Sequence, residues 1–472
     1  MKKIPMIITL IASLVSTSLP YSHVEASEAV ASRPNILFIF ADDWGWEDLS
    51  CHGHPYVRTP NIDRLAVGGT DFHRFTVASG VCSPSRTAVM TGHFPARYNV
   101  DGHFAWVKDN ARRGMPDWVD PAAPMLPRML QSAGYRTAHF GKWHVSNNMI
   151  PDSPPASEYG YDEYGTFNAS GEQMPYDHDA RRAIAFMEKA KAEERPFFIN
   201  LWIHEPHTPF HVIPKYRQMF PELEDDGDSI YAATLAYADE RIGEVLDALD
   251  ALDLADDTLV IFSSDNGPAR AREGQELTMS YDSATGVGFG IAASKGLTGG
   301  RKGYKAALYQ GGINVPFIAR WPGKIPEGAI DDQSMISAVD LLPTFCSIAG
   351  ADLAEGYEPD GINQVATLLG ESTTGREKDL FWKSETRRTK PEASSHWANY
   401  VVVSDHWKFL TNGDPSNMEL YDIVADPLES ENLAEAHPET VLQLQQKLTA
   451  WLATLPAEPT GDVFSELRDS LE

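Results

Sequence analysis

The sequence predicts an α/β protein in which one large domain is followed by a smaller antiparallel subdomain. The chain has 472 residues, which is enough for both units. Residues 35–40 and 258–262 are continuous apolar runs of strand length, as is typical of parallel strands buried on both faces. From about residue 376 the pattern changes to several short strands and one helix, which indicates a small antiparallel sheet.

Hydrophobic periodicity places the remaining elements along the chain. In the large domain the expected strands are 72–77, 196–203 and 315–320, and the expected helices are 59–66, 179–192, 230–249 and 337–349. Residues 145–178 and 268–300 lack clear periodicity and are expected to be long loops that flank a site. In the C-terminal part the expected strands are 380–383, 397–403, 407–410 and 419–422, and the expected helix is 438–452.

The first 26 residues are typical of a secretory signal peptide. Lys2 and Lys3 precede an apolar run at residues 4–15, and a small-residue cleavage site follows at Val24-Glu25-Ala26. The run is too short to span a bilayer comfortably, and it holds no cysteine for a lipid anchor. We therefore expect an exported protein, periplasmic or secreted, without a membrane anchor.

The formal net charge of −28 argues against nucleic acid and anionic membrane surfaces as partners. An anionic ligand would need a local cluster of Lys, Arg and His side chains. Three cysteines are too few for a disulfide scaffold. Cys51 and Cys346 could pair if Cys82 is engaged otherwise, and the sequence leaves this open.

Oxygen-bearing side chains follow the two apolar strands. Asp42 and Asp43 come directly after the first strand, and Asp265 and Asn266 follow the second. Ligands of open α/β sheets bind beyond the carboxyl ends of the strands, so these side chains are expected to meet. Four such oxygens approach the coordination that Ca²⁺ prefers, with Mg²⁺ as the less favoured alternative. Each pair on its own is equally typical of a polar turn.

A short helix is expected after Cys82. Ser83 suits its N-cap and Pro84 its first position, while Gly92 can end it. Cys82 would then lie just outside a helix N-terminus, where anions bind, and Arg86 adds a permanent cation one turn later. Taken alone, Cys-Ser-Pro is also typical of a buried cysteine beside a capped helix.

Cationic side chains stand at the ends of two further strands. Lys142 and His144 are two residues apart just past a strand, so both can point into one pocket. His204 and His207 follow the strand at residues 196–203 and could bind a metal. The neighbouring oxygen ligands favour a hard cation over zinc.

The expected helix carries a longer string: Cys82-Ser83-Pro84-Ser85-Arg86, then three residues, then Met90-Thr91-Gly92. This string resembles the modification signature of the type I sulfatases, in which the cysteine is oxidised to formylglycine. The resemblance covers residues 35 to about 434 and includes Ala41-Asp42-Asp43-Trp44-Gly45, Gly141-Lys142-Trp143-His144, His207-Thr208-Pro209, Asp265-Asn266-Gly267 and residues 303–312. The chain departs from the family twice, with Gln310 in place of Glu and Asn314 in place of Arg.

The resemblance implies the alkaline-phosphatase-like α/β fold, a large mixed sheet with helices on both faces and a smaller C-terminal α+β subdomain. The corresponding units would be residues 33–375 and 376–472. The implied activity is that of a sulfuric ester hydrolase in which hydrated formylglycine at position 82 attacks the sulfur. A formylglycine-generating maturation enzyme would be an obligatory partner.

The same resemblance implies a role for each site residue. Arg86, Lys142 and Lys305 would withdraw charge from the sulfate oxygens. His207 would protonate the leaving alcohol, and His144 would remove the proton that lets sulfate depart. The ligands of the metal ion would be Asp42, Asp43, Asp265, Asn266 and the modified Cys82, and weaker substrate contacts would come from His103, Trp106, His204 and Lys302.

We expect a sulfated carbohydrate as substrate. His103 and Trp106 stand on an aromatic and cationic segment after the nucleophile helix, and aromatic faces suit sugar rings. Both residues are equally typical of core packing. Two alternatives are a phosphate or phosphonate monoester hydrolase of the same superfamily and a non-catalytic binder of sulfated glycans.

Overall fold

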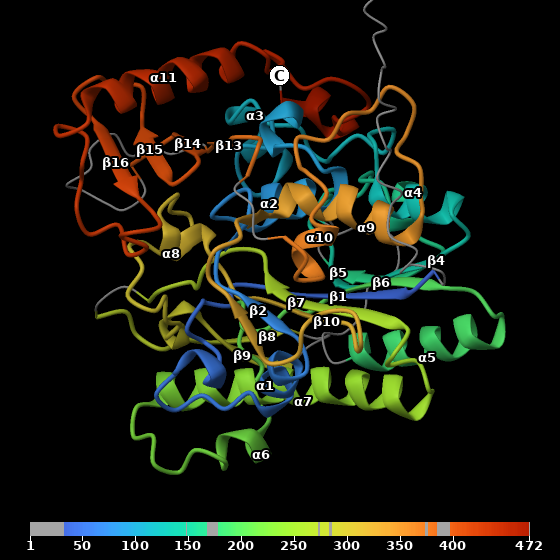
Figure 1. Ribbon diagram of the computed structural model, residues 1–472. Helices are drawn as coiled ribbons and strands as arrows, with labels where there is room; N and C mark the ends of the chain where they lie inside the picture. The colour runs from blue at the N-terminus through green and yellow to red at the C-terminus, as the bar shows by residue number, and fades with distance from the viewer. Residues whose placement is uncertain are drawn as a thin grey trace, which may run out of the picture. The chain divides into compact units, whose positions relative to one another are not determined.

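An eight-stranded mixed sheet forms the centre of the computed structural model (Figure 1). The structure describes residues 33–147, 149–167, 178–271, 274–282, 286–372, 376–384 and 397–471. The strands lie in the order β11 (Ala329–Asp331), β2 (Thr70–Phe72), β10 (Phe317–Arg320), β7 (Thr258–Ser264), β1 (Asn35–Ala41), β6 (Phe197–Trp202), β4 (Arg136–Lys142) and β5 (Glu163–Phe167). The five strands from β7 to β5 run parallel, whereas β10 is antiparallel to both of its neighbours.

Strands β1 and β7 confirm the two buried apolar strands expected from the sequence. Every residue of both strands is buried, because both faces of the sheet are covered. The register pairs Ala41 with Ser264, so the two strands end level with each other. The polar side chains that follow them therefore emerge at the same edge of the sheet.

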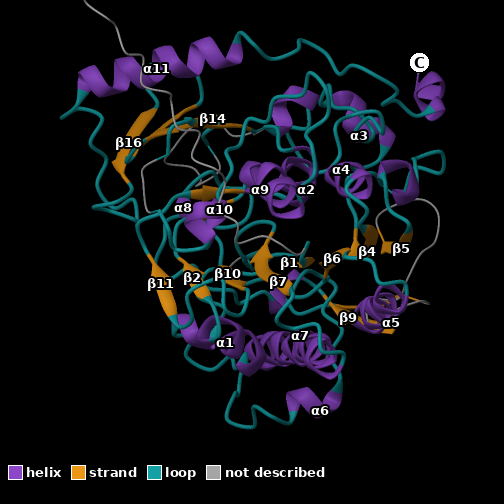
Figure 2. Ribbon diagram, turned by 45° about the vertical axis from the view of Figure 1, so that its right-hand side comes forward, coloured by secondary structure: helices purple, strands orange, loops and turns teal. Residues whose placement is uncertain are grey.

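Helices cover both faces of the central sheet, as expected (Figure 1). One layer contains α1 (Pro60–Val67), α5 (Asp179–Ala192) and α7 (Asp226–Ala251), and α6 (Pro214–Arg217) packs against α7. The other contains α2 (Cys82–Thr91), α4 (Leu126–Ser132), α9 (Leu341–Ala349) and α10 (Val365–Leu368), with α3 (Val107–Arg112) and α8 (Gln310–Ile313) in connecting segments. Figure 2 shows the two layers after a turn about the vertical axis.

Helix α7 is held at its start and along its length by carboxylates. The Asp225 side chain accepts the backbone N–H of Asp228 at 2.9 Å and caps the helix. In the middle of α7, Asp239 accepts the backbone N–H groups of Asn61 and Ile62 at the start of α1. The two helices therefore form one layer under the sheet.

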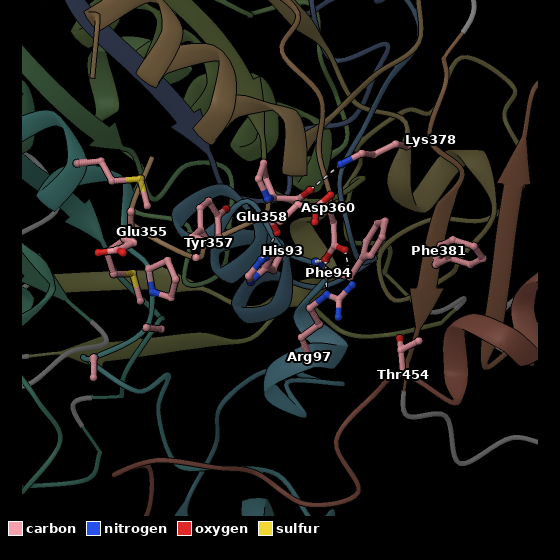
Figure 3. Close-up of a pocket in the computed structure, with 18 of the residues that line it drawn as sticks. His93, Phe94, Arg97, Glu355, Tyr357, Glu358, Asp360, Lys378, Phe381 and Thr454 are labelled. Carbon is pink, nitrogen blue, oxygen red and sulfur yellow. Dashed lines mark hydrogen bonds and ion pairs between the residues drawn. The ribbon is translucent and has the colours of Figure 1, made fainter. Parts of the chain in front are cut away.

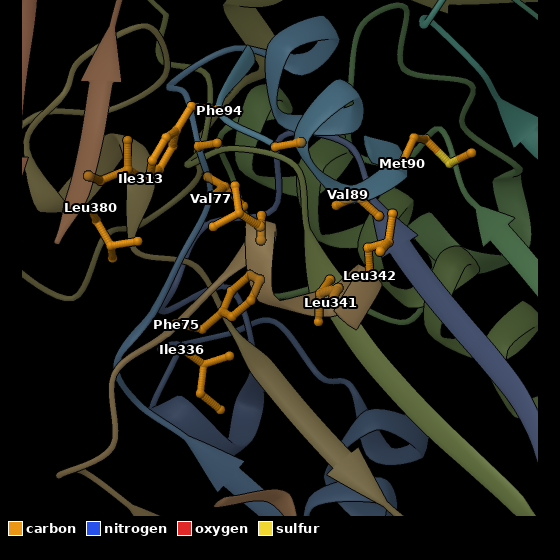
Figure 4. Close-up of a cluster of buried hydrophobic side chains, with 14 of the residues drawn as sticks. Phe75, Val77, Val89, Met90, Phe94, Ile313, Ile336, Leu341, Leu342 and Leu380 are labelled. Carbon is orange, nitrogen blue, oxygen red and sulfur yellow. The ribbon is translucent and has the colours of Figure 1, made fainter. Parts of the chain in front are cut away.

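The C-terminal residues form a separate antiparallel sheet, as the sequence predicts. Its strands are β13 (Leu380–Lys383), β14 (Tyr400–Ser404), β15 (Trp407–Thr411) and β16 (Met418–Asp422), and α11 (Pro438–Leu452) packs against it. Leu380 belongs to the same apolar cluster as Val77, Phe94 and Ile313 of the large domain (Figure 4). By contacts, residues 33–472 form one compact unit.

Three sequence-based expectations about elements are corrected by the structure. The strand expected at residues 72–77 is two strands, because the chain leaves the central sheet after Phe72 and β3 (Phe75–Thr76) pairs with β12 (Ile336–Ser337). The expected loops contain the edge strand β5 and a hairpin of β8 (Met279–Asp282) and β9 (Gly286–Phe289). The helix expected from residue 337 begins as a 3-10 turn, and α9 starts at Leu341.

The signal peptide expected at residues 1–26 lies outside the described residues. Within the described part of the chain, no helix has both the length and the apolar character needed to cross a bilayer.

Candidate active site

Three buried carboxylates meet at the carboxyl edge of the parallel strands. Asp42 and Asp43 follow β1 and Asp265 follows β7, and one oxygen of each lies within 4.8 Å of the others. The Asn266 side chain joins them by donating a hydrogen bond from Nδ2 to Asp43 Oδ1 at 2.7 Å. Asp43 has a φ of 69°, a left-handed conformation that costs energy and is frequent at functional sites. The structure thus brings together the four protein residues expected to bind a metal.

The donor atoms of this cluster fit a hard divalent cation. Asp42 Oδ1 and Asn266 Oδ1 are buried and have no hydrogen-bond partner among the described residues. Burying such oxygens without a partner is unfavourable, and a bound cation would remove that cost. A donor set made only of carboxylate and amide oxygens is the set that Ca²⁺ and Mg²⁺ prefer.

Two lysines face this group of carboxylates. Lys142, the last residue of β4, donates from Nζ to Asp42 Oδ2 at 2.5 Å, and Lys305 Nζ lies 2.6 Å from Asp43 Oδ1. Burial alone would raise the pKa of Asp42, but the surrounding His207, Lys142 and other cations hold it well below its usual value. Burial would lower the pKa of Lys305, but Asp43 and Cys82 raise it overall. Both lysine side chains therefore lie in direct contact with the carboxylates.

Arg86 lies behind the carboxylates. Its side chain is wholly buried, and its Nη2 donates to Asp265 Oδ2 at 2.6 Å. Nη1 donates to the carbonyl oxygen of Lys142 at 3.0 Å, and the guanidinium packs over the Trp202 ring. Arg86 is not among the residues that line the pocket over Cys82. Its hydrogen bonds orient Asp265 and the end of β4, and the role expected for it, withdrawal of charge from the sulfate oxygens, stays a prediction.

Cys82 is the first residue of α2, so the helix begins two positions earlier than the sequence suggests, and Cys82 lies within it rather than just outside. Val81 is the extended N-cap residue, and the expected cap, Ser83, instead accepts the backbone N–H of Phe104 at 3.0 Å. Gly92 ends the helix in the left-handed conformation, as expected. Burial raises the pKa of the Cys82 thiol, so an unmodified side chain stays protonated at neutral pH.

His144 is oriented towards Cys82 by its second ring nitrogen. Nε2 lies 3.0 Å from the carbonyl oxygen of Phe104, which can only accept a hydrogen bond. Nε2 therefore carries the hydrogen, and Nδ1, 3.1 Å from Cys82 Sγ, has a free lone pair in the neutral ring. Burial, followed by the Lys142 charge, lowers the pKa of His144 well below its usual value. The ring is thus neutral and can accept a proton from the side chain at position 82.

A pocket of about 320 Å³ opens over Cys82. It brings together six residues predicted from the sequence, namely Cys82, His103, Lys142, His144, His207 and Lys305. Val81, Phe104, Asn147 and Met149 complete the wall and were not singled out from the sequence. Asn147 and Met149 belong to the segment 145–178, expected to flank the site, whereas no described residue of 268–300 lines this pocket.

His207 lines this pocket, whereas His204 and Trp106 do not. His207 Nδ1 donates to the carbonyl oxygen of Thr208 at 2.6 Å, and its Nε2 lies 3.9 Å from Asp43 Oδ2. His204 is buried and packs between the rings of Phe167 and His207, behind the pocket. Trp106 is 58% exposed and does not line the pocket.

Lys302 points away from the pocket. Its Nζ donates to the hydroxyl of Tyr421 in β16 at 2.8 Å and lies 4.2 Å from the centre of the Tyr309 ring. Lys302 therefore links the large domain to the C-terminal sheet, and Lys305 is the lysine of this segment that faces Cys82.

The two departures from the family motif have local partners. The backbone N–H of Gln310 donates to Glu429 Oε2 at 2.6 Å, so a carboxylate from the C-terminal part lies beside this position. The Asn314 side chain donates to the carbonyl oxygens of His73 and Phe75. Cys51 and Cys346 are both free thiols, one exposed and one buried, so they do not pair.

A larger cavity, of about 1020 Å³, lies beyond the other end of α2 (Figure 3). It shares no lining residue with the pocket over Cys82. Its polar side chains are largely paired within the protein: Arg97 binds Asp360 through two hydrogen bonds, and Lys378 donates to the carbonyl oxygen of Pro359. Volume therefore does not identify the reactive site, whereas the grouping of carboxylates, lysines and Cys82 does.

Family comparisons agree with this site. A family model described as Sulfatase matches residues 34–351, which include every residue of the site. The chain is a member of the sulfatase family. A second model, described as N-sulphoglucosamine sulphohydrolase, C-terminal, matches residues 301–457 of this sulfatase and covers its antiparallel sheet.

Individual relatives match over almost the full chain. The sulfatase is 28% identical over 505 residues to the N-acetylgalactosamine-6-O-sulfatase of Bacteroides thetaiotaomicron, covering 89% of this chain and 93% of the relative. It is 31% identical over 495 residues to arylsulfatase A of Homo sapiens, and the match covers 92% of this chain and 90% of the relative. The crystal structure of Ps i-CgsB in complex with k-i-k-neocarrahexaose superposes with a TM-score of 0.75 at 23% identity, and the match covers 93% of this chain and 96% of that one. The two proteins share the alkaline-phosphatase-like fold.

Proposed function

We propose that this sulfatase removes sulfate from a sulfated carbohydrate after Cys82 has been converted to formylglycine. The observation that carries the proposal is the position of Cys82, at the start of α2, 3.1 Å from a neutral His144 and in one pocket with Lys142 and Lys305. A buried, protonated thiol is a poor nucleophile, which favours conversion over direct use of the cysteine. Formylglycine, once hydrated, supplies an oxygen nucleophile in its place.

A divalent cation would be held by Asp42, Asp43, Asp265 and Asn266. Ca²⁺ is the proposed ion, with Mg²⁺ less favoured, because the four residues offer only oxygen donors and leave two buried oxygens unpaired. When bound, the ion would supply Lewis-acid stabilisation of the sulfate oxygens. Arg86 keeps Asp265 oriented and charged for this purpose.

The cationic side chains of the pocket receive the substrate anion. Lys142 and Lys305 are held beside the carboxylates in fixed positions, so their charges are already in place when the sulfate group enters. His144 Nδ1 accepts the proton from position 82 and thereby allows sulfate to leave. His207 also lines the pocket, and in its doubly protonated form it would donate the Nε2 proton to the oxygen of the leaving alcohol.

The proposed substrate class rests on the relatives and on the pocket wall. One relative is an N-acetylgalactosamine-6-O-sulfatase, and a structural neighbour was solved with a bound oligosaccharide. His103 stands at the pocket over Cys82 and can bind a hydroxyl or second sulfate of a sugar ring. The protein would act in the periplasm or outside the cell, after maturation by a formylglycine-generating enzyme.

Two measurements test the proposal. The tryptic peptide that contains residue 82 should be about 18 Da lighter than the cysteine form, as expected for formylglycine. Steady-state turnover of matched sulfate and phosphonate esters should favour the sulfate, whereas preference for the phosphonate would assign the chain to the related hydrolase activity. His103→Ala should raise KM for a sulfated saccharide and leave that for an aryl sulfate unchanged, with Lys108→Ala on the same exposed segment as control.

A further inference from the structure

We propose that Cys51, His52 and Asp71 form a second metal site, suited to Zn²⁺ and separate from the active site. Cys51 and His52 lie on a 3-10 turn (Ser50–His52), and Asp71 lies on β2. One donor atom of each lies within 4.8 Å of the others. None of the three lines the pocket over Cys82 or belongs to the cluster of active-site carboxylates.

Hydrogen bonding fixes the orientation of the His52 ring. Nδ1 lies 2.5 Å from the carbonyl oxygen of Trp46, which only accepts, so Nδ1 carries the hydrogen. In the neutral ring, Nε2 then has a lone pair directed at Asp71 Oδ2, 2.7 Å away. A metal ion bound by both atoms would remove the repulsion between these two acceptors. A ring held through its other nitrogen by a backbone carbonyl is the usual arrangement of a metal-binding histidine.

Asp71 supplies an independent indication of a missing cation. Its side chain is buried, with 6% of the residue exposed, and its Oδ1 has no hydrogen-bond partner among the described residues. A buried carboxylate oxygen without a partner among the described residues is unfavourable, and a bound cation would remove that cost.

The donor set selects the kind of metal. Cys51 has a free and exposed thiol, and its backbone N–H is anchored to Asp63 Oδ1 at 3.0 Å. His73 Nε2, 3.5 Å from Asp71 Oδ2, stands next to the cluster as a fourth donor. Sulfur, imidazole nitrogen and carboxylate oxygen together suit tetrahedral Zn²⁺, unlike the oxygen-only active-site cluster, which suits Ca²⁺.

The surrounding rings keep these donors in place. Trp46 stacks on His52 with ring centres 4.1 Å apart and meets the edge of His73 at 5.2 Å. The Arg301 guanidinium covers the Trp46 ring at 3.7 Å. Two donors on a tetrahedral ion with bonds of about 2.0 Å lie about 3.3 Å apart, and the donor atoms of this cluster lie within 4.8 Å of one another before any metal is bound.

Zinc binding to the mature full-length chain tests this site. Equilibrium dialysis in the presence of saturating Ca²⁺, followed by elemental analysis, should give one Zn²⁺ per chain in addition to calcium. Cys51→Ser and His52→Phe should each weaken Zn²⁺ binding at least tenfold. The first alters an exposed side chain, and the second retains a ring that can stack on Trp46, so both variants should fold. The surface variant His406→Asn serves as the matched histidine control and should bind Zn²⁺ normally.

Cobalt binding tests directly whether the Cys51 sulfur is a metal ligand. Co²⁺ bound to the wild-type chain should show thiolate-to-metal charge-transfer absorption, and Cys51→Ser should abolish it. The proposal is overturned if the wild type binds no more Zn²⁺ than the double variant Cys51→Ser/His52→Phe. It is also overturned if the cobalt spectrum lacks the charge-transfer band. Neither outcome depends on sulfatase activity.

Discussion

Nδ1 of His144 lies 3.1 Å from Sγ of Cys82, and the same ring is held through Nε2 by the carbonyl oxygen of Phe104. Phe104 is itself fixed, because its backbone N–H donates to Ser83 on α2. The helix that carries Cys82 therefore also orients, through one intervening residue, the base that faces Cys82. This arrangement fixes both the position and the tautomer of His144.

Replacing His144 by Ala should lower kcat roughly 100-fold, the usual order for loss of a general base, while KM changes little. The reason is that His144 acts on position 82, whereas the two lysines that bind the anion remain. Steady-state kinetics on a sulfate ester measures both constants, with the surface variant His406→Ala as control. A loss below threefold in kcat would show that His144 does not handle this proton.

Removing a metal ligand should weaken activity and stability together. In Asp43→Ala and Asn266→Ala, calcium should no longer raise the melting temperature, since the ion stabilises only the folded chain that binds it. For the wild type, calcium at 1,000 times its Kd should contribute about 4 kcal/mol. Calorimetry with and without chelator measures the effect, and the exposed Asp256→Ala should behave as wild type. If the melting temperature of the wild type does not change when a chelator is added, a stabilising ion is excluded.

Asp48 should make folding stability depend on pH. Burial raises the pKa of Asp48 to about 7, although Gly45, Leu297 and Tyr231 all donate hydrogen bonds to it. Between pH 4 and 7 the folded state therefore keeps a proton that the unfolded state has lost. The stability contributed by Asp48 is largest below pH 4, falls as the pH rises to about 7 and is constant above that.

The variant Asp48→Asn cannot titrate, so it isolates this effect. The stability advantage of the wild type over Asp48→Asn should shrink by ~3 kcal/mol between pH 5 and pH 8. Urea unfolding of both proteins at the two pH values provides the comparison, and His54 nearby contributes to both. If the stability advantage of the wild type over Asp48→Asn stays constant or grows as the pH rises, Asp48 is ionised normally in the folded protein.

The Lys408–Glu429 pair should behave as a buried ion pair. Nζ and Oε1 lie 2.7 Å apart with both side chains fully buried, and Glu429 also accepts the N–H of Gln310 near the active-site segment. Glu429→Gln should cost about 3–5 kcal/mol, because Lys408 is left as an uncompensated charge, and adding Lys408→Met should recover most of that loss. The exposed pair gives the control: Lys189→Met should change stability by less than ~1 kcal/mol. A double variant as unstable as Glu429→Gln would refute the pairing.

The sequence predicts the strand ends well because apolar runs are local signals. The continuous runs of β1 and β7, and the rule that ligands bind beyond strand ends, were sufficient to group Asp42, Asp43, Asp265 and Asn266. The edge strand β5 was missed, because its sequence, Glu-Tyr-Gly-Thr-Phe, is short and does not alternate cleanly. The β8–β9 hairpin was missed within a segment rich in Gly and Ser for a similar reason.

Side-chain direction depended on tertiary partners that the sequence does not reveal. Ser83 was expected to cap the helix, but its hydroxyl oxygen accepts a hydrogen bond from the backbone N–H of Phe104, 21 residues away. Arg86 lies behind Asp265 because its guanidinium donates a hydrogen bond to that buried carboxylate. Lys302 and Lys305 are three residues apart in an aperiodic segment, so the sequence does not distinguish their directions. Lys302 points to the C-terminal sheet because its Nζ donates a hydrogen bond to Tyr421 there. Cys51 and Asp71 likewise meet only once β2 has joined the sheet.

The most direct test of the account is the release of inorganic sulfate from a panel of sulfated oligosaccharides by enzyme produced together with a formylglycine-generating enzyme. The account predicts sustained release from at least one saccharide, and none from Cys82→Ala prepared in the same way, because that variant keeps the cationic pocket but has no nucleophile. Release by Cys82→Ala at more than a few per cent of the wild-type rate, or turnover of aryl sulfates with no saccharide accepted, would contradict it.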